Sequence, residues 1–180
     1  MASSSHILTQ VLSRGGIIAH QTDTVFGLAC IPKEASLQRL ARLKQRDTGR
    51  GFILLASNCE QLNNYIECTP DELKQLSYQH TPPTTYLVNA KPHLPASLLG
   101  QHSKIAVRIV QHPTVAEICR NIGAIASTSC NISQQEICND ASICRTLFGP
   151  HIDYIETESI TGTGHASRII DLSTQKILRE

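Results

Sequence analysis

The chain has 180 residues, of which 41% are hydrophobic and 17% are charged, a balance typical of one globular domain. Its formal net charge is +1, so no global electrostatic field attracts it to nucleic acid or to a membrane. It has no Trp, three Phe and four Tyr, so aromatic platforms for base stacking are scarce. No run approaches the roughly 18 apolar residues of a transmembrane helix, so we expect no membrane partner. We expect residues 1–180 to form a single domain.

The seven cysteines are odd in number and irregularly spaced, and no two of them form a C-x-x-C pair. Neither a disulfide framework nor a zinc site fits this pattern. The N-terminus also lacks the charged and apolar regions of a signal peptide. We therefore expect reduced, non-catalytic thiols and a cytoplasmic protein with no protein-held metal site.

Apolar runs alternate with amphipathic segments along the chain. Helical spacing predicts helices over residues 3–14, 34–43, 57–65, 69–78, 113–122 and 134–147. Short apolar runs predict strands over residues 16–20, 25–30, 52–56, 85–88, 105–110, 124–129, 152–155, 168–172 and 177–178. Residues 91–103 and 161–164 are predicted to be connections. This order predicts one α/β domain with a twisted sheet, helices packed on it and a basic concave face.

A basic segment follows the second predicted helix. Between Arg39 and Arg50 the chain has five Lys or Arg residues and one acid, Asp47. We expect this segment to form an exposed elbow, on which Lys44 and Arg46 converge on phosphate groups. The alternative is a solvated helix end whose cations interact favourably with the helix dipole.

The strand predicted over residues 124–129 ends in hydroxyl groups, in the segment Ser127–Ser133. Small hydroxyl and amide groups at the carboxyl edge of a sheet suit a pocket for phosphate or ribose. The alternative is that Asn131 or Ser133 caps the helix that follows.

Arg108 lies inside an apolar strand and therefore needs an anionic partner, because an unpaired buried charge is very costly. That partner is either a structural carboxylate, such as Asp171 or Glu117, or the carboxylate of a ligand. Elsewhere Thr22, Asp23 and Thr24 either bind a ligand or stabilise a turn. Ser167 and Arg168 follow a glycine-rich loop that either approaches a ligand or is merely flexible.

Five short motifs, in order along the chain, together resemble the YrdC-like family, most closely its short, single-domain bacterial TsaC form. The resemblance extends from Ile7 to Arg179. The family's K-x-R and S-x-N signatures match Lys44-Gln45-Arg46 and Ser129-Cys130-Asn131. Three further motifs match Gln21–Leu28, Ala106–Ile109 and Ala166–Asp171. The sequence departs from the family's usual residues at His20, Gln21, Asp47, Pro82, Cys130 and Ala166.

The resemblance implies a YrdC-like mixed sheet and a threonylcarbamoyl-AMP synthase, a nucleotidyltransferase of tRNA modification. Such an enzyme converts ATP, L-threonine and bicarbonate (or CO2) into threonylcarbamoyl-AMP and pyrophosphate, with Mg2+ carried on the ATP. It works with the pathway enzymes TsaB, TsaD and TsaE. The competing hypothesis is a non-catalytic module that binds double-stranded RNA or tRNA.

The same resemblance assigns roles to residues of this chain. Lys44 and Arg46 are expected to be catalytic. The residues expected to bind ATP are Lys44, Arg46, Ser129, Asn131, Ser167 and Arg168. Those expected to bind threonine are Thr22, Thr24, Arg108 and Thr128.

Overall fold

The computed structural model describes residues 4–47, 49–78, 80–138, 140–157 and 162–180. Its helices are α1 (Ser4–Ser13), α2 (Glu34–Leu43), α3 (Pro70–Ser77), α4 (Ala96–Leu99), α5 (Pro113–Ile122) and α6 (Ala141–Phe148). Its strands are β1 (Ile18–His20), β2 (Gly27–Cys30), β3 (Ile53–Ala56), β4 (Ile66–Glu67), β5 (Thr84–Ala90), β6 (Lys104–Ile109), β7 (Ile125–Ser129), β8 (Tyr154–Ile155), β9 (Arg168–Asp171) and β10 (Ile177–Arg179).

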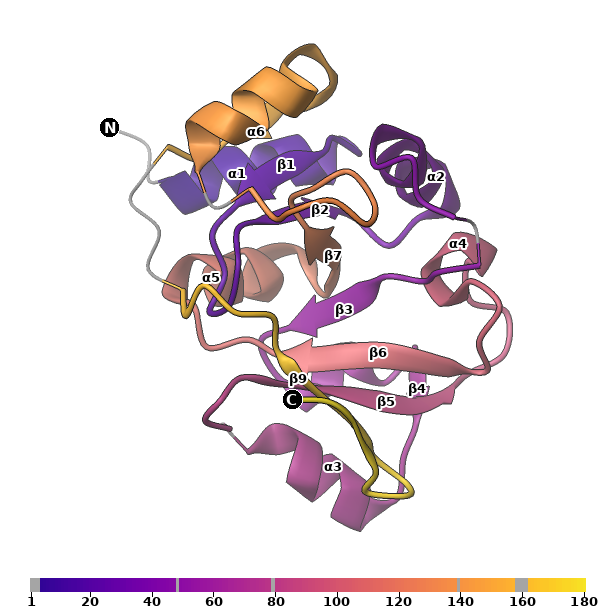
Figure 1. Ribbon diagram of the computed structural model, residues 1–180. Helices are drawn as coiled ribbons and strands as arrows, with labels where there is room; N and C mark the ends of the chain where they lie inside the picture. Colours follow the sequence, from indigo (N-terminus) through magenta and orange to yellow (C-terminus); the bar gives the residue numbers. More distant parts are fainter. Residues whose placement is uncertain (1–3, 48, 79, 139, 158–161) are drawn as a thin grey trace.

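These strands form one mixed sheet in the order β10-β9-β5-β6-β3-β7-β2-β1-β8, with β4 added beside β5 (Figure 1). Strand β3 runs parallel to β6 and antiparallel to β7, and β7 is also antiparallel to β2. The register pairs Leu55 with Arg108, and Ile53 with Ser127. Because directly paired residues point to the same face of a sheet, the side chains of these four residues share one face. The prediction of a twisted mixed α/β sheet is confirmed.

The helices cover the sheet unequally. On the face that carries Leu55, α1 and α5 bury a compact apolar cluster against β1, β2, β3 and β7. A larger cluster collects the alternate strand residues together with residues of α2, α3, α4 and α6. Beyond the edge of α5, the part of this same face that carries Arg108 is not covered by a helix of the described residues (Figure 1). The pocket described below lies on this uncovered part.

The helix predicted over residues 134–147 is wrong in its first half. Gln134 has a φ of 69°, in the left-handed region that a right-handed helix excludes. The backbone N–H of Cys138 instead donates to the carbonyl of Cys130, so this segment folds back over the end of β7. Helix α6 begins only at Ala141, where the Asp140 side chain caps it by accepting from the N–H of Ser142.

The helix predicted over residues 57–65 is also wrong. Only a 3-10 turn forms, at Cys59–Leu62, where the Asn58 side chain caps the N-terminus by accepting from the N–H of Gln61. The connection predicted over residues 91–103 contains the short helix α4, and part of the loop predicted over residues 161–164 lies outside the described residues. In the described part of the chain, no helix is both long and apolar enough to span a bilayer.

His20, at the end of β1, is fully buried and provides a test of acid stability. Its Nδ1 donates to the carbonyl of Gln21 at 2.8 Å, while its Nε2 has no hydrogen-bond partner among the described residues. Burial, with a smaller contribution from the charge of Arg108, lowers the pKa of His20 from 6.5 to about 4. The folded protein therefore holds this ring neutral over a range in which the unfolded chain protonates it.

Between pH 6.5 and pH 4 the unfolded state binds the extra proton, so His20 lowers the free energy of unfolding as the pH falls. The loss reaches at most about 3 kcal/mol. We expect His20→Phe to flatten the pH dependence over this range, in denaturant unfolding measured at pH 7 and pH 4.5. The exposed His6→Gln is the control; a parent-like slope in His20→Phe would contradict the assignment.

Candidate functional site

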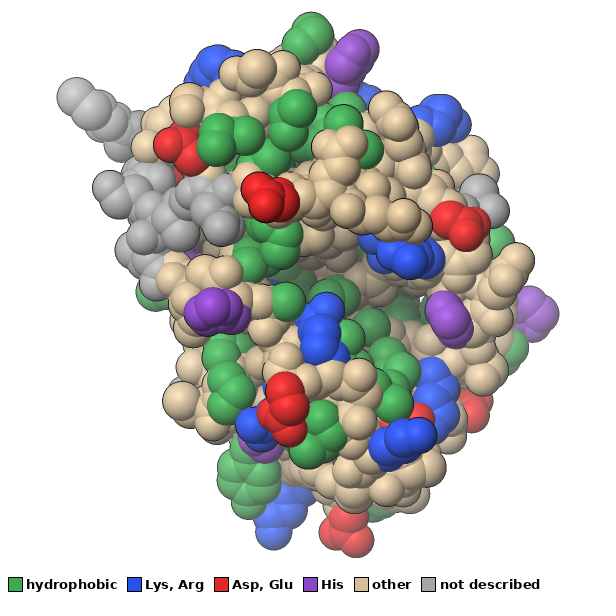
Figure 2. Space-filling model, in the orientation of Figure 1, with side chains coloured by type: hydrophobic (Ala, Val, Ile, Leu, Met, Phe, Trp, Pro, Cys, Tyr) green, Lys and Arg blue, Asp and Glu red, His purple; other side chains and the backbone are tan. Residues whose placement is uncertain are grey.

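A pocket of about 620 Å³ opens on the part of the Leu55 face that α1 and α5 leave uncovered. This volume lies within the roughly 300–1,000 Å³ of small-molecule sites. Figure 2 shows the hollow, with Lys and Arg side chains along its margin. The cations that line the pocket are Arg46, Arg50, Lys104, Arg108 and Arg179. Among the described residues that line it there is no Asp or Glu, so the pocket suits an anionic ligand.

Arg46 follows α2 and is held by backbone carbonyls. Its guanidinium donates to the carbonyls of Arg50 and Gly51 and, at 3.5 Å, to the Thr128 hydroxyl. It also stacks over the Phe52 ring, 5.1 Å from the ring centroid. Burial and the charge of Arg50 lower its pKa, yet an Arg side chain remains protonated. These contacts preorganise a cation at one end of the pocket.

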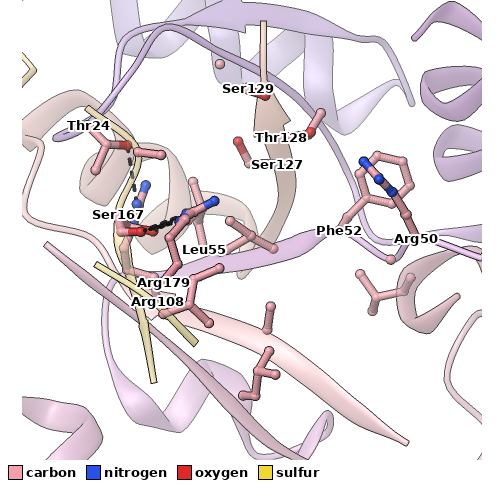
Figure 3. A pocket seen from close by; sticks show the side chains of 18 of the residues that line it. Thr24, Arg50, Phe52, Leu55, Arg108, Ser127, Thr128, Ser129, Ser167 and Arg179 are labelled. Carbon is pink, nitrogen blue, oxygen red and sulfur yellow. Dashed lines mark hydrogen bonds between the residues drawn. The ribbon is translucent and has the colours of Figure 1, made fainter. Parts of the chain in front are cut away.

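The end of β7 supplies hydroxyl groups, as the sequence predicted. Ser127, Thr128 and Ser129 line the pocket above Leu55 (Figure 3). The alternative that Asn131 or Ser133 caps the next helix is wrong, because Asp140 caps α6. Asn131 is instead buried beneath the end of the strand, where its Oδ1 accepts from the Ser129 hydroxyl at 2.8 Å.

Arg108 has a structural partner that differs from the carboxylates predicted from the sequence. Its Nη2 lies 3.1 Å from Oδ1 of Asp23, and its Nη1 donates to the Thr24 hydroxyl at 3.3 Å. Burial lowers the pKa of Arg108, and the Asp23 carboxylate opposes that shift. Neither Asp171 nor Glu117 fills this role: Asp171 pairs with Lys104 at 2.6 Å. Arg108 still lines the pocket, and its Nε has no hydrogen-bond partner among the described residues.

Thr22 and Thr24 form a tight polar turn and also line the pocket. The Thr22 hydroxyl donates to the carbonyl of Val25, and it accepts from the N–H of Thr24. Gly162 packs directly on the carbonyls of this turn, where a Cβ would clash with backbone. The glycine-rich loop therefore approaches the Thr22–Thr24 turn closely, which explains its glycine in physical terms.

The last two strands contribute one residue that was predicted and one that was missed. Ser167 lies beside Arg108 and Arg179 (Figure 3). Its hydroxyl is hydrogen-bonded to that of Thr85 at 2.8 Å. Arg179 donates to the carbonyl of Ser167 at 2.7 Å and lines the pocket. Arg168, predicted to bind ATP, instead points away and pairs with Glu180. The only sequence signal for Arg179 was its place at the end of a short apolar run.

Lys44 is not on an exposed elbow, and this expectation is corrected. It is 1% exposed, and it is absent from the residues that line the pocket. Its Nζ donates to the carbonyls of Ser129 and Asn131 and to the Asn131 side chain, at 2.5 to 2.8 Å. Burial lowers its pKa from 10.5 to about 8. The K-x-R pair is thus divided, with Arg46 in the pocket and Lys44 behind its wall.

All seven cysteines are free thiols. Among the described residues, no group of three or more His, Cys, Asp or Glu side chains is arranged to hold a metal ion. Lys, Arg, His, Ser and Thr supply the polar side chains that line the pocket.

The chain matches a family model named Sua5_yciO_yrdC, described as telomere recombination, over residues 10–180. It is 36% identical to the threonylcarbamoyl-AMP synthase of Thiobacillus denitrificans, over 93% of this chain and 90% of that protein. It is 37% identical to the threonylcarbamoyl-AMP synthase of Methylobacillus flagellatus, over 96% of this chain and 97% of that protein.

Among solved structures, P. abyssi Sua5 in complex with L-threonine superposes with a TM-score of 0.86 and 26% identity. The match covers 94% of this chain and 51% of the P. abyssi chain. The structure of E. coli YciO shares the fold, with a TM-score of 0.78 and 20% identity, over 99% of this chain and 91% of that one. With a family model that matches nearly its whole length and relatives more than 30% identical, this chain belongs to the Sua5/YciO/YrdC family.

Proposed function

We propose that the protein is a threonylcarbamoyl-AMP synthase, which joins L-threonine, bicarbonate or CO2, and ATP into threonylcarbamoyl-AMP with release of pyrophosphate. The observation that carries the proposal is the pocket itself, in which five cations and several hydroxyl groups face one cavity without a lining carboxylate among the described residues. The relatives named for this activity match almost end to end.

The phosphates of ATP are proposed to bind at the Arg46 end. Arg46 and Arg50 offer guanidinium groups there, and Phe52 and the backbone of Gly51 hold the Arg46 side chain in place. A guanidinium can form two parallel hydrogen bonds to a phosphate, a bidentate contact that an ammonium cannot make. Such fixed cations stabilise the charge that grows on the phosphates in the transition state.

Threonine is proposed to bind at the opposite end, where Arg108 and Thr24 meet (Figure 3). Ser167, which the family resemblance assigned to ATP, also lies at this end and is reassigned to threonine in this proposal. Arg108 keeps its guanidinium in the pocket although Asp23 neutralises part of its charge, and the remaining donor capacity suits one small carboxylate. The hydroxyl of Thr22 completes the polar lining there, whereas the hydroxyl of Thr128, which was expected to bind threonine, accepts from Arg46 at the phosphate end. The structure of P. abyssi Sua5 in complex with L-threonine supports threonine as the ligand, although not its position in this pocket.

The reaction requires positioning and charge neutralisation more than a covalent nucleophile. The amine of threonine adds to CO2 and loses a proton to give a carbamate. A carbamate oxygen then attacks the α-phosphorus in line, and the bond from that phosphorus to the departing pyrophosphate breaks. Arg46 holds the phosphates, and Arg108 holds the threonine carboxylate, so that the two reactants face each other.

Mg2+ is proposed to arrive on the ATP phosphates, because the pocket offers no lining carboxylate among the described residues to hold it. When bound, it would supply further neutralisation of phosphate charge. The protein is further proposed to act in the cytoplasm and to pass its product to the TsaB, TsaD and TsaE enzymes or to a tRNA-bound complex. The free thiols are compatible with that compartment.

The proposed activity is tested by measuring pyrophosphate release from ATP with and without threonine and bicarbonate. We expect release only when all three substrates are present, and a loss of about 100-fold in kcat/KM for Arg46→Met. Arg42→Met, an exposed cation on α2, is the matched control and should retain activity. A salt-dependent RNA affinity without threonine-dependent release would support the RNA-binding module instead.

A second prediction concerns Arg108→Lys. The lysine keeps a positive charge near Asp23 but loses the planar fork, so threonine affinity should fall by about tenfold or more. The affinity for a non-hydrolysable ATP analogue should change far less. Calorimetric titration of each ligand checks this, and a loss confined to the ATP analogue would reverse the assignment of the two ends.

A third prediction concerns the chain-specific Cys130. Its thiol is buried; hydrogen bonding to Cys144 and burial both raise its pKa above the usual value, so it carries no thiolate at neutral pH. We expect Cys130→Ala to keep activity and to lower the free energy of unfolding by about 1 kcal/mol. A loss of activity greater than about tenfold in the pyrophosphate assay would assign this thiol a chemical role.

A further inference from the structure

The buried ammonium of Lys44 has no donor left for a ligand. An ammonium has three N–H groups, and three oxygen acceptors surround Nζ: the carbonyls of Ser129 and Asn131 and the Oδ1 of Asn131. The backbone carbonyl of Lys44 in turn accepts from the N–H of Ser133. Lys44 therefore holds both ends of the segment Ser129–Ser133: its side chain binds the Ser129 carbonyl, and its backbone carbonyl binds the N–H of Ser133.

The orientation of the Asn131 amide is determined by its neighbours. An ammonium can only donate, so the atom that faces Lys44 must be the acceptor Oδ1. A carbonyl can only accept, so the atom that faces the carbonyl of Gln135, at 2.7 Å, must be Nδ2. Both contacts agree on one orientation of the side chain.

This orientation decides the polarity of Ser129. Its hydroxyl lies 2.8 Å from Oδ1 of Asn131, which can only accept, so Ser129 must donate its single proton there. The two lone pairs of the Ser129 hydroxyl oxygen are then the only groups of this side chain that can bind a ligand in the pocket. Ser129 lines the pocket, and it therefore faces a ligand as an acceptor. A phosphate oxygen is also an acceptor and would make a poor partner for it.

We propose that Lys44 and Asn131 are positioning residues that hold Ser129 as a hydrogen-bond acceptor for an N–H or O–H group of the substrate, and that neither of them contacts phosphate. This inference rests on the proposed function, because the substrate groups concerned are the ribose hydroxyls of ATP or the amine and hydroxyl of threonine. The phosphates are left to the guanidinium groups at the other end of the pocket.

The first test uses inorganic tripolyphosphate, which has phosphate oxygens but no ribose, in calorimetric titrations. Arg46→Met should weaken its binding by about tenfold or more, whereas Ser129→Ala and Lys44→Met should each leave it within about threefold. If Lys44→Met or Ser129→Ala weakened tripolyphosphate as much as Arg46→Met, the proposal would be overturned.

The second test identifies the donor that Ser129 accepts. For a ribose donor, a non-hydrolysable ATP analogue should bind the parent about tenfold more tightly than its 2′,3′-dideoxy form, and Ser129→Ala should abolish that difference. For a threonine donor, Ser129→Ala should weaken threonine by a similar factor and leave the two nucleotides unaffected. If Ser129→Ala changed neither ligand, Ser129 would not be an acceptor for substrate.

A third measurement needs no substitution and so does not depend on a variant that folds. Acetic anhydride should modify the exposed Lys33 of the parent protein and spare Lys44, with or without the ATP analogue. Modification of Lys44 in the free protein, with protection by the analogue, would make Lys44 a ligand and overturn the proposal. If no nucleotide binds to the parent protein, the proposed function fails. The labelling of the free protein still decides whether the Lys44 ammonium is buried among its three oxygen acceptors.

Positioning is separated from general stability by kinetics and hydrogen exchange. In the ligand-free protein, Lys44→Met should increase amide exchange at Ser133 and Cys138 by about tenfold, while Arg46→Met should not. Lys44→Met should lower kcat and leave the affinity for tripolyphosphate within about threefold, because the phosphate ligands remain. Unchanged exchange together with weakened tripolyphosphate binding would contradict a positioning role.

Discussion

The burial of one ammonium group, that of Lys44, determines the shape of the pocket wall. An unpaired charge in this position would be very costly, so the chain must bring oxygen atoms to it. It does so by bending the backbone after β7 until two carbonyls and an amide oxygen converge on Nζ. The segment that follows does not continue as a helix. It folds back over the end of β7 through the Cys138–Cys130 hydrogen bond.

The same principle explains why the pocket is strongly cationic in a chain whose formal net charge is only +1. Its buried cations are held by neutral oxygen atoms or by carboxylates placed outside the lining. Backbone carbonyls hold Arg46, while Asp23 and Asp171, behind the lining, pair with Arg108 and Lys104. Because the anions lie behind the cations, the cavity keeps a positive surface while each charge retains a partner.

Much of the fold could be predicted, because hydrophobic periodicity reflects burial directly. The helix over residues 113–122 and the strands around Arg108 and Ser127 were predicted almost to the residue. The helix over residues 134–147 was extended too far because periodicity does not record the left-handed backbone at Gln134. The burial of Lys44 did have a signal, since Lys44 follows Leu37, Leu40 and Ala41 on the apolar stripe of its helix. The basic neighbours of Lys44 favoured the opposite interpretation.

Partners that are distant in sequence were harder to predict, because local pattern gives no information about them. The pairing of Arg108 with Asp23 joins residues 85 positions apart, and it depends on how β6 and the turn after β1 meet in the sheet. Arg179 reaches the pocket only because β10 folds back on β9, beside Ser167. In both cases the residue type indicated a need for a partner, and only the sheet topology identified that partner.

Three of the six positions at which this chain departs from its family's usual residues lie in the wall of the pocket, whereas Ala166 lies in the lining. His20, Gln21 and Cys130 are all buried, and none of them lines the pocket. They change the packing behind the turn after β1 and behind the end of β7, where neutral groups replace one another. The cations Arg46 and Arg108, whose charge the proposed chemistry requires, stand within matched motifs. A wall can be repacked with another neutral side chain as long as the oxygen atoms around Lys44 stay in place, because those atoms determine which way the Ser129 hydroxyl points.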